Sequence, residues 1–145
     1  MSLFKQLEKA EKGNKTQLSD IIAALKFNDD GLVPAIAQQY DSGEVLMMAW
    51  MNAESLAESL ETGRVCYFSR SRQKLWRKGE SSGQIQKLLD VRFDCDGDAL
   101  LLAVDQTGPA CHTGRKSCFY HKVNKDEVVI DSAPEIDPGQ LYGKH

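Results

Sequence analysis

The residues of this chain with the greatest capacity for chemistry are concentrated between positions 94 and 118. Six side chains in that stretch are candidate metal ligands: Asp94, Cys95, Asp96, Asp98, Cys111 and Cys118. Thiolates are ligands that suit zinc, whereas clustered carboxylates suit hard cations such as magnesium. The two ligand chemistries interleave here, which predicts a site that uses metal in a reaction.

The spacing of the three aspartates indicates a single hard cation. If residues 94–98 are extended, the aspartates point to one face of the strand and Cys95 points to the other. Three carboxylates on one face repel each other strongly unless a cation lies between them. A cation such as magnesium would relieve that repulsion.

The three cysteines predict a zinc site with an open position. A glycine-containing turn separates Cys111 from Cys118, so the chain can fold back and bring both thiols to one point. Cys95 would reach a partner on the opposite side of its strand. Three thiolates leave a fourth tetrahedral position for water, which is typical of catalytic zinc. A structural zinc site would normally contain Cys-x-x-Cys pairs, and the sequence has none.

Other interpretations of these residues remain open. The three cysteines could be small buried hydrophobic side chains, which is the interpretation we favour for Cys66. Disulfides are not expected, because no signal peptide precedes the cysteines. The aspartates could form a solvated acidic turn. A calcium loop is disfavoured, because Gly97 is wrongly placed and an apolar, strand-like run follows it.

A second candidate site is the segment from Arg70 to Lys78, which contains five basic residues in an acidic protein. Two glycines just after it, Gly79 and Gly83, bracket small hydroxyl side chains and allow backbone N–H groups to approach an anion. We interpret this segment as a phosphate-binding loop. The alternative is a solvated basic loop. A nucleic-acid surface is disfavoured, because only Trp76 offers a stacking face nearby.

The composition is that of an ordinary globular domain. The chain has 145 residues, 41% of them hydrophobic and 27% charged, and its net charge is −3. One domain of this length can bury a substantial core, and the negative charge argues against general nucleic-acid binding. No long apolar stretch or charged leader is present, so we expect no membrane span, no secretory signal and a cytoplasmic location.

The first half of the chain predicts helices and a hairpin. Residues 2–12 and 16–26 have helical patterns, the second with Thr16 placed to cap it. A turn at Asp41–Gly43 joins extended segments at 32–39 and 45–51, and Pro34 indicates that the first of these is an edge strand. Asn52 is placed to cap a helix at 53–62, which Gly63 ends.

The second half predicts short strands at 64–69, 84–93, 99–104, 117–123 and 127–131. In the second of these, alternation places Ile85, Leu89, Val91 and Phe93 on one buried face. Short strands joined by turns favour an α+β fold with a mainly antiparallel sheet and short helices. We expect a helical N-terminal appendage at residues 1–26, the main domain at 27–132 and an irregular tail at 133–145.

Five motifs in order resemble the phosphoribosyl-AMP cyclohydrolase family of histidine biosynthesis. They are Gly31–Ala35, Ser69–Arg72, Trp76–Gly83, Asp94–Asp98 and Gly108–Phe119. The resemblance covers residues 27–123. It implies zinc at Cys95, Cys111 and Cys118, and magnesium at Asp94, Asp96 and Asp98. It also implies an intertwined homodimer whose zinc site takes cysteines from both chains.

The resemblance further implies hydrolytic opening of the N1–C6 bond in the adenine ring of 1-(5-phosphoribosyl)-AMP, with zinc-bound hydroxide attacking C6. His112, beside a zinc cysteine, is our candidate general acid or base, and an orienting role is the alternative. Candidate phosphate-binding residues are Arg70, Arg72, Lys78 and Ser82.

Two other functions use the same residues. A zinc deaminase would attack the same kind of carbon and expel the exocyclic amine, but its usual His-x-Glu and Cys-x-x-Cys motifs do not occur here. A zinc-stabilised binding module would fold on metal and show no turnover.

Overall fold

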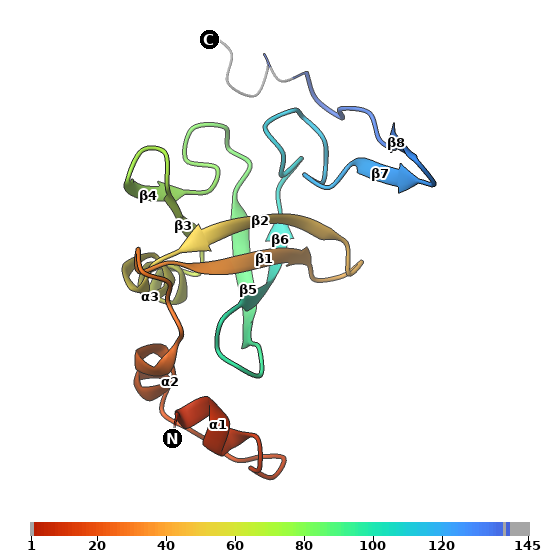
Figure 1. The fold of residues 1–145 in the computed structure, drawn as a ribbon. Helices are drawn as coiled ribbons and strands as arrows, with labels where there is room; N and C mark the ends of the chain where they lie inside the picture. Colours follow the sequence, from red (N-terminus) through yellow and green to blue (C-terminus); the bar gives the residue numbers. More distant parts are fainter. Residues whose placement is uncertain (1, 138, 140–145) are drawn as a thin grey trace.

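A twisted sheet of six strands forms the centre of the computed structural model, which describes residues 2–137 and 139 (Figure 1). Its strands are β1 (Val33–Gln39), β2 (Val45–Met51), β3 (Cys66–Ser69), β4 (Lys74–Arg77), β5 (Gln86–Phe93) and β6 (Leu100–Gln106). Their order across the sheet is β4-β3-β2-β1-β6-β5. The predicted α+β class is confirmed. The sheet is mixed, because β1 and β6 are parallel while the other neighbours are antiparallel.

The prediction that Pro34 marks an edge strand is wrong. Strand β1 lies between β2 and β6, at the middle of the sheet. The ladder with β6 begins at Ala35, one residue after the proline. The missing N–H of Pro34 therefore lies outside the stretch that β6 pairs, and the strand loses no bond to that neighbour.

The core lies on one face of this sheet. Exposure alternates along β1, so that Val33, Ala35 and Ala37 are fully buried. Helix α3 (Ala53–Thr62) packs beside β2 and β3 and buries Leu56. The predicted ends of this helix are confirmed, because Asn52 caps it in a reciprocal arrangement with Ser55 and Gly63 ends it with a φ of 75°.

Strand β5 departs from the simple alternation predicted for it. The register with β6 shifts between Leu88 and Asp90, which is a β-bulge. The extra residue turns Leu89 outward, where it is 46% exposed, while Leu88, Val91 and Phe93 pack against the core. The prediction that Leu89 shares the buried face is therefore wrong.

Strand β4 was not predicted, because its basic residues favoured a loop. It forms because β3 supplies an antiparallel partner, with Tyr67 opposite Trp76. The two rings pack with their centroids 5.4 Å apart. This contact anchors the basic segment to the sheet at its apolar positions.

The two N-terminal helices are shorter than predicted. Helix α1 spans Leu3–Leu7 and α2 spans Leu18–Ala24, and all the residues between them, 8–17, are exposed. That polar linker has no apolar face to pack, so the helical pattern does not extend through it. Gln17, not Thr16, precedes α2 and makes no side-chain cap. None of the described helices is long and apolar enough to cross a membrane.

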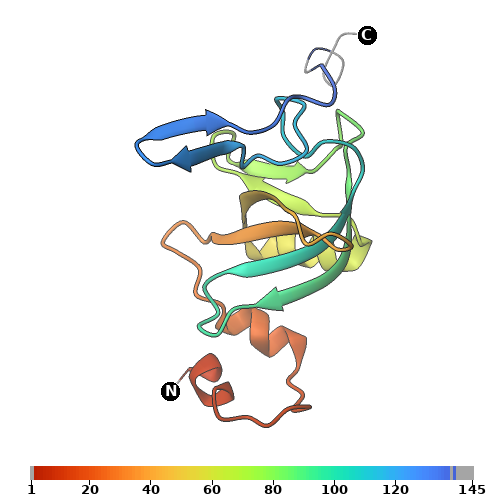
Figure 2. The same ribbon diagram turned by 90° about the vertical axis from the view of Figure 1, so that its right-hand side faces the viewer.

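A separate hairpin follows the main sheet (Figure 2). It consists of β7 (His121–Asn124) and β8 (Glu127–Ile130), and all residues of both strands are exposed. Strand β7 begins later than predicted, because Ser117 and Cys118 are bonded to β2 instead, through the carbonyl oxygens of Val45 and Leu46. Residues 133–137 form neither helix nor strand.

Candidate functional site

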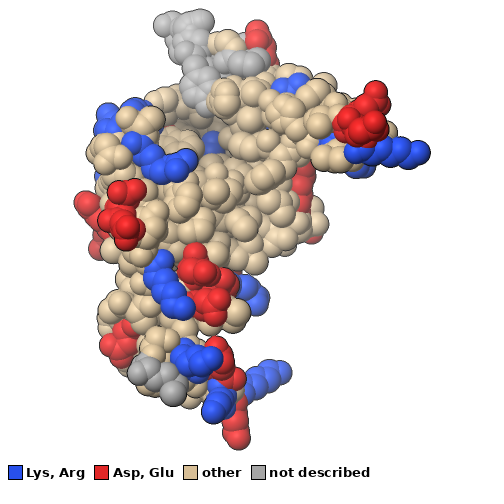
Figure 3. Space-filling model, in the orientation of Figure 1, with Lys and Arg blue, Asp and Glu red and all other residues tan. Residues whose placement is uncertain are grey.

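A cavity of about 540 Å³ opens beside β4 and the loop that follows it. Its lining residues are Arg72, Lys74, Leu75, Trp76, Arg77, Lys78, Gly79, Glu80, Ser81, Ser82 and His112. Figure 3 shows basic side chains around a hollow on this side of the molecule. Four predicted site residues therefore meet here, namely Arg72, Lys78, Ser82 and His112.

Arg70 is the predicted phosphate-binding residue that does not line this cavity. Its guanidinium carbon lies 4.9 Å from the centroid of the Trp50 ring, a cation–π contact with β2. Lys74 and Trp76 do line the cavity, although they were not among the predicted site residues. Lys74 and Trp76 reach the cavity because β4 pairs with β3, and local sequence patterns do not indicate that pairing.

The loop after β4 is folded tightly. The Gly83 N–H donates to the Gly79 carbonyl at 2.8 Å, and the Glu80 N–H donates to the Arg77 carbonyl at 3.0 Å. Gly79 has a φ of 84°, and a Cβ at that position would lie 2.5 Å from the backbone nitrogen of Ile85. Only glycine fits such a close approach, so Gly79 brings the serine-containing loop against the start of β5.

Lys78 is the most deeply buried cation of the cavity, at 5% exposure. No hydrogen bond or ion pair joins its ammonium to another described residue. Burial lowers the pKa of Lys78, and the nearby thiols of Cys118 and Cys111 act in the opposite direction. Arg77, by contrast, is engaged by Glu58 through two hydrogen bonds of 2.8 and 2.9 Å. Lys78 is thus the buried positive charge available to an anion or to the thiols.

The loop after β6 brings Cys111 and Cys118 together. The N–H groups of Ala110 and Cys111 donate to the carbonyls of Lys116 and Arg115, each at 3.1 Å, so the chain folds back as its glycine predicted. The Thr113 hydroxyl donates to the Cys111 sulfur at 3.1 Å. All four cysteines are free thiols.

The pKa values of the two thiols shift in opposite directions. Burial would raise the pKa of Cys111, but hydrogen bonds from Thr113 and from the Cys118 thiol outweigh it and the pKa is lowered. Burial, followed by the charge of Cys111, raises the pKa of Cys118 to about 12. A thiolate hydrogen-bonded to a thiol is a donor set that fits a soft cation such as zinc, which would displace the shared proton.

The aspartates do not lie on an extended strand, so that prediction is wrong. Residues 94–98 form the turn between β5 and β6, closed by a bond from the Asp94 N–H to the Ala99 carbonyl at 3.0 Å. The Asp98 N–H donates to the Asp94 carboxylate at 2.9 Å. Glycine at position 97, with a φ of 73°, allows the chain to reverse here, where an extended segment would separate the carboxylates.

The turn nevertheless gathers carboxylates. A hydrogen bond to the Asp94 carboxylate, together with the charges of Asp94 and Asp96, raises the pKa of Asp98, whereas the pKa of Asp94 is lowered. Neighbouring carboxylate oxygens are a donor set that fits a hard divalent cation. Cys95 and Asp96 are exposed beside them, with the Cys95 sulfur 3.9 Å from an Asp96 carboxylate oxygen.

The acidic turn and the thiol pair lie at opposite ends of the sheet (Figures 1 and 2). Strand β6 runs from one to the other, and its seven residues span roughly 20 Å. Cys95 is therefore remote from Cys111 and Cys118 within one chain. Within residues 2–137 and 139, no three or more His, Cys, Asp or Glu side chains are grouped to hold a metal.

Comparison with known proteins identifies the family to which this chain is related. The family model for phosphoribosyl-AMP cyclohydrolase matches residues 47–120. A protein named phosphoribosyl-AMP cyclohydrolase from Alkalilimnicola ehrlichii is 66% identical over 140 residues, which are 97% of this chain and 99% of that protein. One of the same name from Chromohalobacter salexigens is 63% identical over 141 residues, 97% of each chain. One from Acidiphilium cryptum is 72% identical over 106 residues, 73% of this chain and 91% of its own.

The relatives are enzymes by name, and the basic lining of the cavity suits an anionic small molecule. The chain belongs to the phosphoribosyl-AMP cyclohydrolase family. The resemblance indicated by its motifs is thereby confirmed.

Proposed function

We propose that this enzyme opens the adenine ring of 1-(5-phosphoribosyl)-AMP by hydrolysis of its N1–C6 bond, as a step of histidine biosynthesis. The observation that carries the proposal is the single cavity in which the basic residues of β4 and its loop meet His112, next to the paired thiols. A substrate with two phosphates and a purine ring requires this combination of positive charge, an aromatic wall and a hydrolytic centre. The names of the relatives support the same reaction.

Arg72 and Ser82 are placed to bind a phosphate of the substrate. Both line the cavity, and the glycines of the loop around Ser82 leave room for backbone N–H groups to approach an oxyanion. Lys78 lies deeper, between this entrance and the thiols. Arg70 contributes by its contact with Trp50, which holds the start of the basic segment against β2.

The metal ligands are Cys111, Cys118 and Cys95 of a second copy for zinc, and Asp94, Asp96 and Asp98 for magnesium. A zinc ion bound there would supply Lewis-acid chemistry, because it lowers the pKa of water toward about 7 and makes hydroxide available near neutral pH. Magnesium would neutralise the acidic turn and hold phosphate or ligand oxygens in place. The donor sets described above support both assignments.

His112 is the group that moves protons in this scheme. It is exposed on the wall of the cavity, directly after Cys111. An imidazole has a nitrogen that can accept a proton and later donate it, so His112 can take a proton from the attacking water. As water adds to C6 and the C6–N1 bond breaks, the same imidazole returns that proton to N1, and the ring opens without loss of atoms.

A homodimer brings the two ends of the sheet together in this proposal. The surface over β1 and β2 is broad and almost uncharged in the view of Figure 3, and β2 exposes the large apolar side chains of Val45 and Met48. Hydrophobic area of this kind supports contact with another protein surface. A second copy seated there would bring its own Cys95 to the thiols of the first. Reduced thiols fit a cytoplasmic setting.

The test is product identity. Purified protein supplied with zinc and magnesium is incubated with 1-(5-phosphoribosyl)-AMP, and the products are separated and assayed for ammonia. The proposal predicts the ring-opened aminoimidazole carboxamide and no ammonia. Ammonia release would indicate a deaminase instead. An unchanged substrate alongside zinc-dependent folding would indicate a binding module.

A further inference from the structure

The acidic turn at residues 94–98 is closed by hydrogen bonds of its own, but it lies almost entirely at the surface. Asp94, Cys95, Asp96 and Asp98 are all exposed, and Gly97 is the one buried residue of the turn. Like charges on neighbouring carboxylates repel and oppose those bonds, so contacts from outside the turn help to keep its shape. The buried position of Gly97 shows where that support is applied.

Helix α1 supports the 94–98 turn through the side chain of Phe4. The Phe4 ring lies directly over Gly97, and a Cβ added there would overlap the ring carbons Cε2, Cδ2 and Cζ. Phe4 is 7% exposed, and its ring centroid lies 6.5 Å from that of Phe93, the last residue of β5 before the turn. The ring therefore packs on the turn and on the strand that leads into it.

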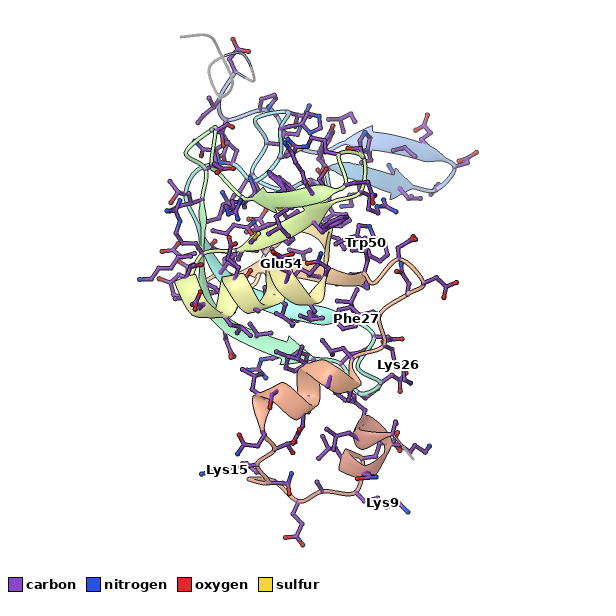
Figure 4. The ribbon with its side chains drawn as sticks, turned by 90° about the vertical axis from the view of Figure 1, so that its left-hand side faces the viewer. Lys9, Lys15, Lys26, Phe27, Trp50 and Glu54 are labelled. Carbon is purple, nitrogen blue, oxygen red and sulfur yellow. The ribbon has the colours of Figure 1, made fainter. Side chains whose placement is uncertain are left out.

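A second contact joins the same N-terminal segment to the same residue. The Lys26 N–H donates to the Gly97 carbonyl at 2.8 Å. Lys26 lies where the chain leaves α2, close to the end of the β5–β6 hairpin (Figure 4). The neighbouring Leu25 is buried in the core, which fixes this junction. Gly97 is thus held by a ring on one side and by a backbone bond on the other.

We propose that α1 acts through Phe4 as a clamp that holds the 94–98 turn in the geometry its metal-ligating side chains require. Phe4 is a positioning residue in this scheme and touches neither metal nor substrate. The inference rests on the proposed role of the turn in metal binding. It gives residues 1–26, which lie outside the matched family model, a part in the active site.

The test compares three variants of the full-length, zinc-supplied protein. Phe4→Ala removes the ring, Phe4→Leu keeps an apolar side chain over Gly97, and Leu56→Ala removes equally buried packing from α3, away from the turn. Calorimetry measures the affinity for Mn²⁺, used as a magnesium substitute. Hydrogen exchange at the Gly97 and Asp98 amides, in protein without added Mn²⁺, measures the order of the turn.

The clamp predicts that Phe4→Ala binds Mn²⁺ about 10-fold more weakly, as expected when support around metal ligands is lost. The Gly97 and Asp98 amides of Phe4→Ala should exchange faster than those of the unaltered protein. Phe4→Leu should recover part of the Mn²⁺ affinity and part of the protection from exchange. Leu56→Ala should match the unaltered protein in both measurements. Normal Mn²⁺ affinity in Phe4→Ala overturns the clamp, as does an equal loss in Leu56→Ala. Failure of the unaltered protein to bind Mn²⁺ overturns the magnesium assignment and the clamp together.

Discussion

Cys66 and Cys111 are both buried thiols, yet their surroundings give them opposite chemistry. Burial, reinforced by the charge of Glu58, raises the pKa of Cys66 to about 11 and leaves it a neutral, inert thiol. Cys111 receives hydrogen bonds from Thr113 and Cys118, and its pKa is lowered. A thiolate is the form that binds metal, so Cys111 is the readier ligand. The pKa of Cys118 is also raised, but Cys118 is paired with Cys111, whereas Cys66 has no such thiol partner among the described residues.

Replacing Cys111 by serine should therefore remove zinc and abolish ring opening. Serine keeps the size of the side chain but is a far poorer ligand for a soft metal. Zinc content is measured by elemental analysis, and turnover by product formation. The matched variant Cys66→Ser should keep both. Full activity in Cys111→Ser would mean that the thiol pair is not the metal site.

Lys78 and Lys74 line the same cavity but differ in burial. A buried cation acts on an anion through a medium of low dielectric constant, whereas the field of an exposed one is weakened by water and salt. Lys78→Met should lower kcat/KM by roughly 10-fold or more, in the range expected for a lost buried charge. Lys74→Met should cost less and lose its effect at high salt. Equal losses in the two variants would show that the depth of Lys78 carries no special role.

Helix α3 and strand β4 are joined by the Glu58–Arg77 pair. Hydrogen bonds from Arg77 lower the pKa of Glu58 below its ordinary value of 4.5. A carboxyl group whose folded-state pKa is depressed contributes stability that is fully present above its unfolded-state pKa and is lost as the pH falls through the folded value.

Glu58→Gln should consequently destabilise the protein at pH 7 and have no effect in strongly acid solution. The free energy of unfolding is measured in urea at several pH values. The difference between variant and unaltered protein should shrink as the pH drops below 4.5. A difference that stays constant across this range would show that packing, not charge, joins the two elements.

Two glycines in the loop after β4 allow a paired test of how closely this loop packs against the start of β5. Gly79 and Gly83 both have positive φ, but a Cβ would meet the backbone of Ile85 at the first and open space at the second. Gly83→Ala should cost only the conformational strain, about 1–2 kcal/mol. Gly79→Ala should cost clearly more and also reduce turnover, because the loop must move away from β5. Similar stabilities in denaturant for the two variants would contradict this account of the loop.

Local signals in the sequence predicted these elements to different extents. The cap at Asn52 and the end at Gly63 depend on neighbours within one turn of helix, and both were predictable. Strand β4 depends on Tyr67 of another strand, and the outward position of Leu89 depends on a bulge against β6. Such pairings join residues distant in sequence, so periodicity alone could not indicate them.

The candidate site, too, could be predicted only in part from local sequence patterns. Residue type and spacing single out the candidate metal ligands, the basic segment and His112, and the structure places the basic segment and His112 at one cavity. The shape of the acidic turn was not predictable, because an alternation of aspartates suggests a strand while Gly97 with positive φ makes a reversal. The contact of Phe4 with that turn spans most of the domain in sequence and left no local signal.

In the whole molecule, Cys95 in the acidic turn lies far from the Cys111–Cys118 pair, although the proposed zinc site needs all three thiols. Strand β6 carries the acidic turn at one end and leads to the thiol pair at the other, so the proposed zinc ligands of one chain are divided between the two ends. Two copies arranged with these ends adjacent would complete two sites. The protein should accordingly be a homodimer in solution, as measured by light scattering.

The most direct measurement of this account is the activity of a mixed dimer. Cys95→Ser and Cys111→Ser chains, each inactive alone, are co-expressed with different affinity tags, and the heterodimer is isolated through both tags. A shared site predicts substantial ring-opening activity and bound zinc, because one of the two composite sites regains all three thiolates. An isolated heterodimer with neither zinc nor turnover would contradict a site shared between chains.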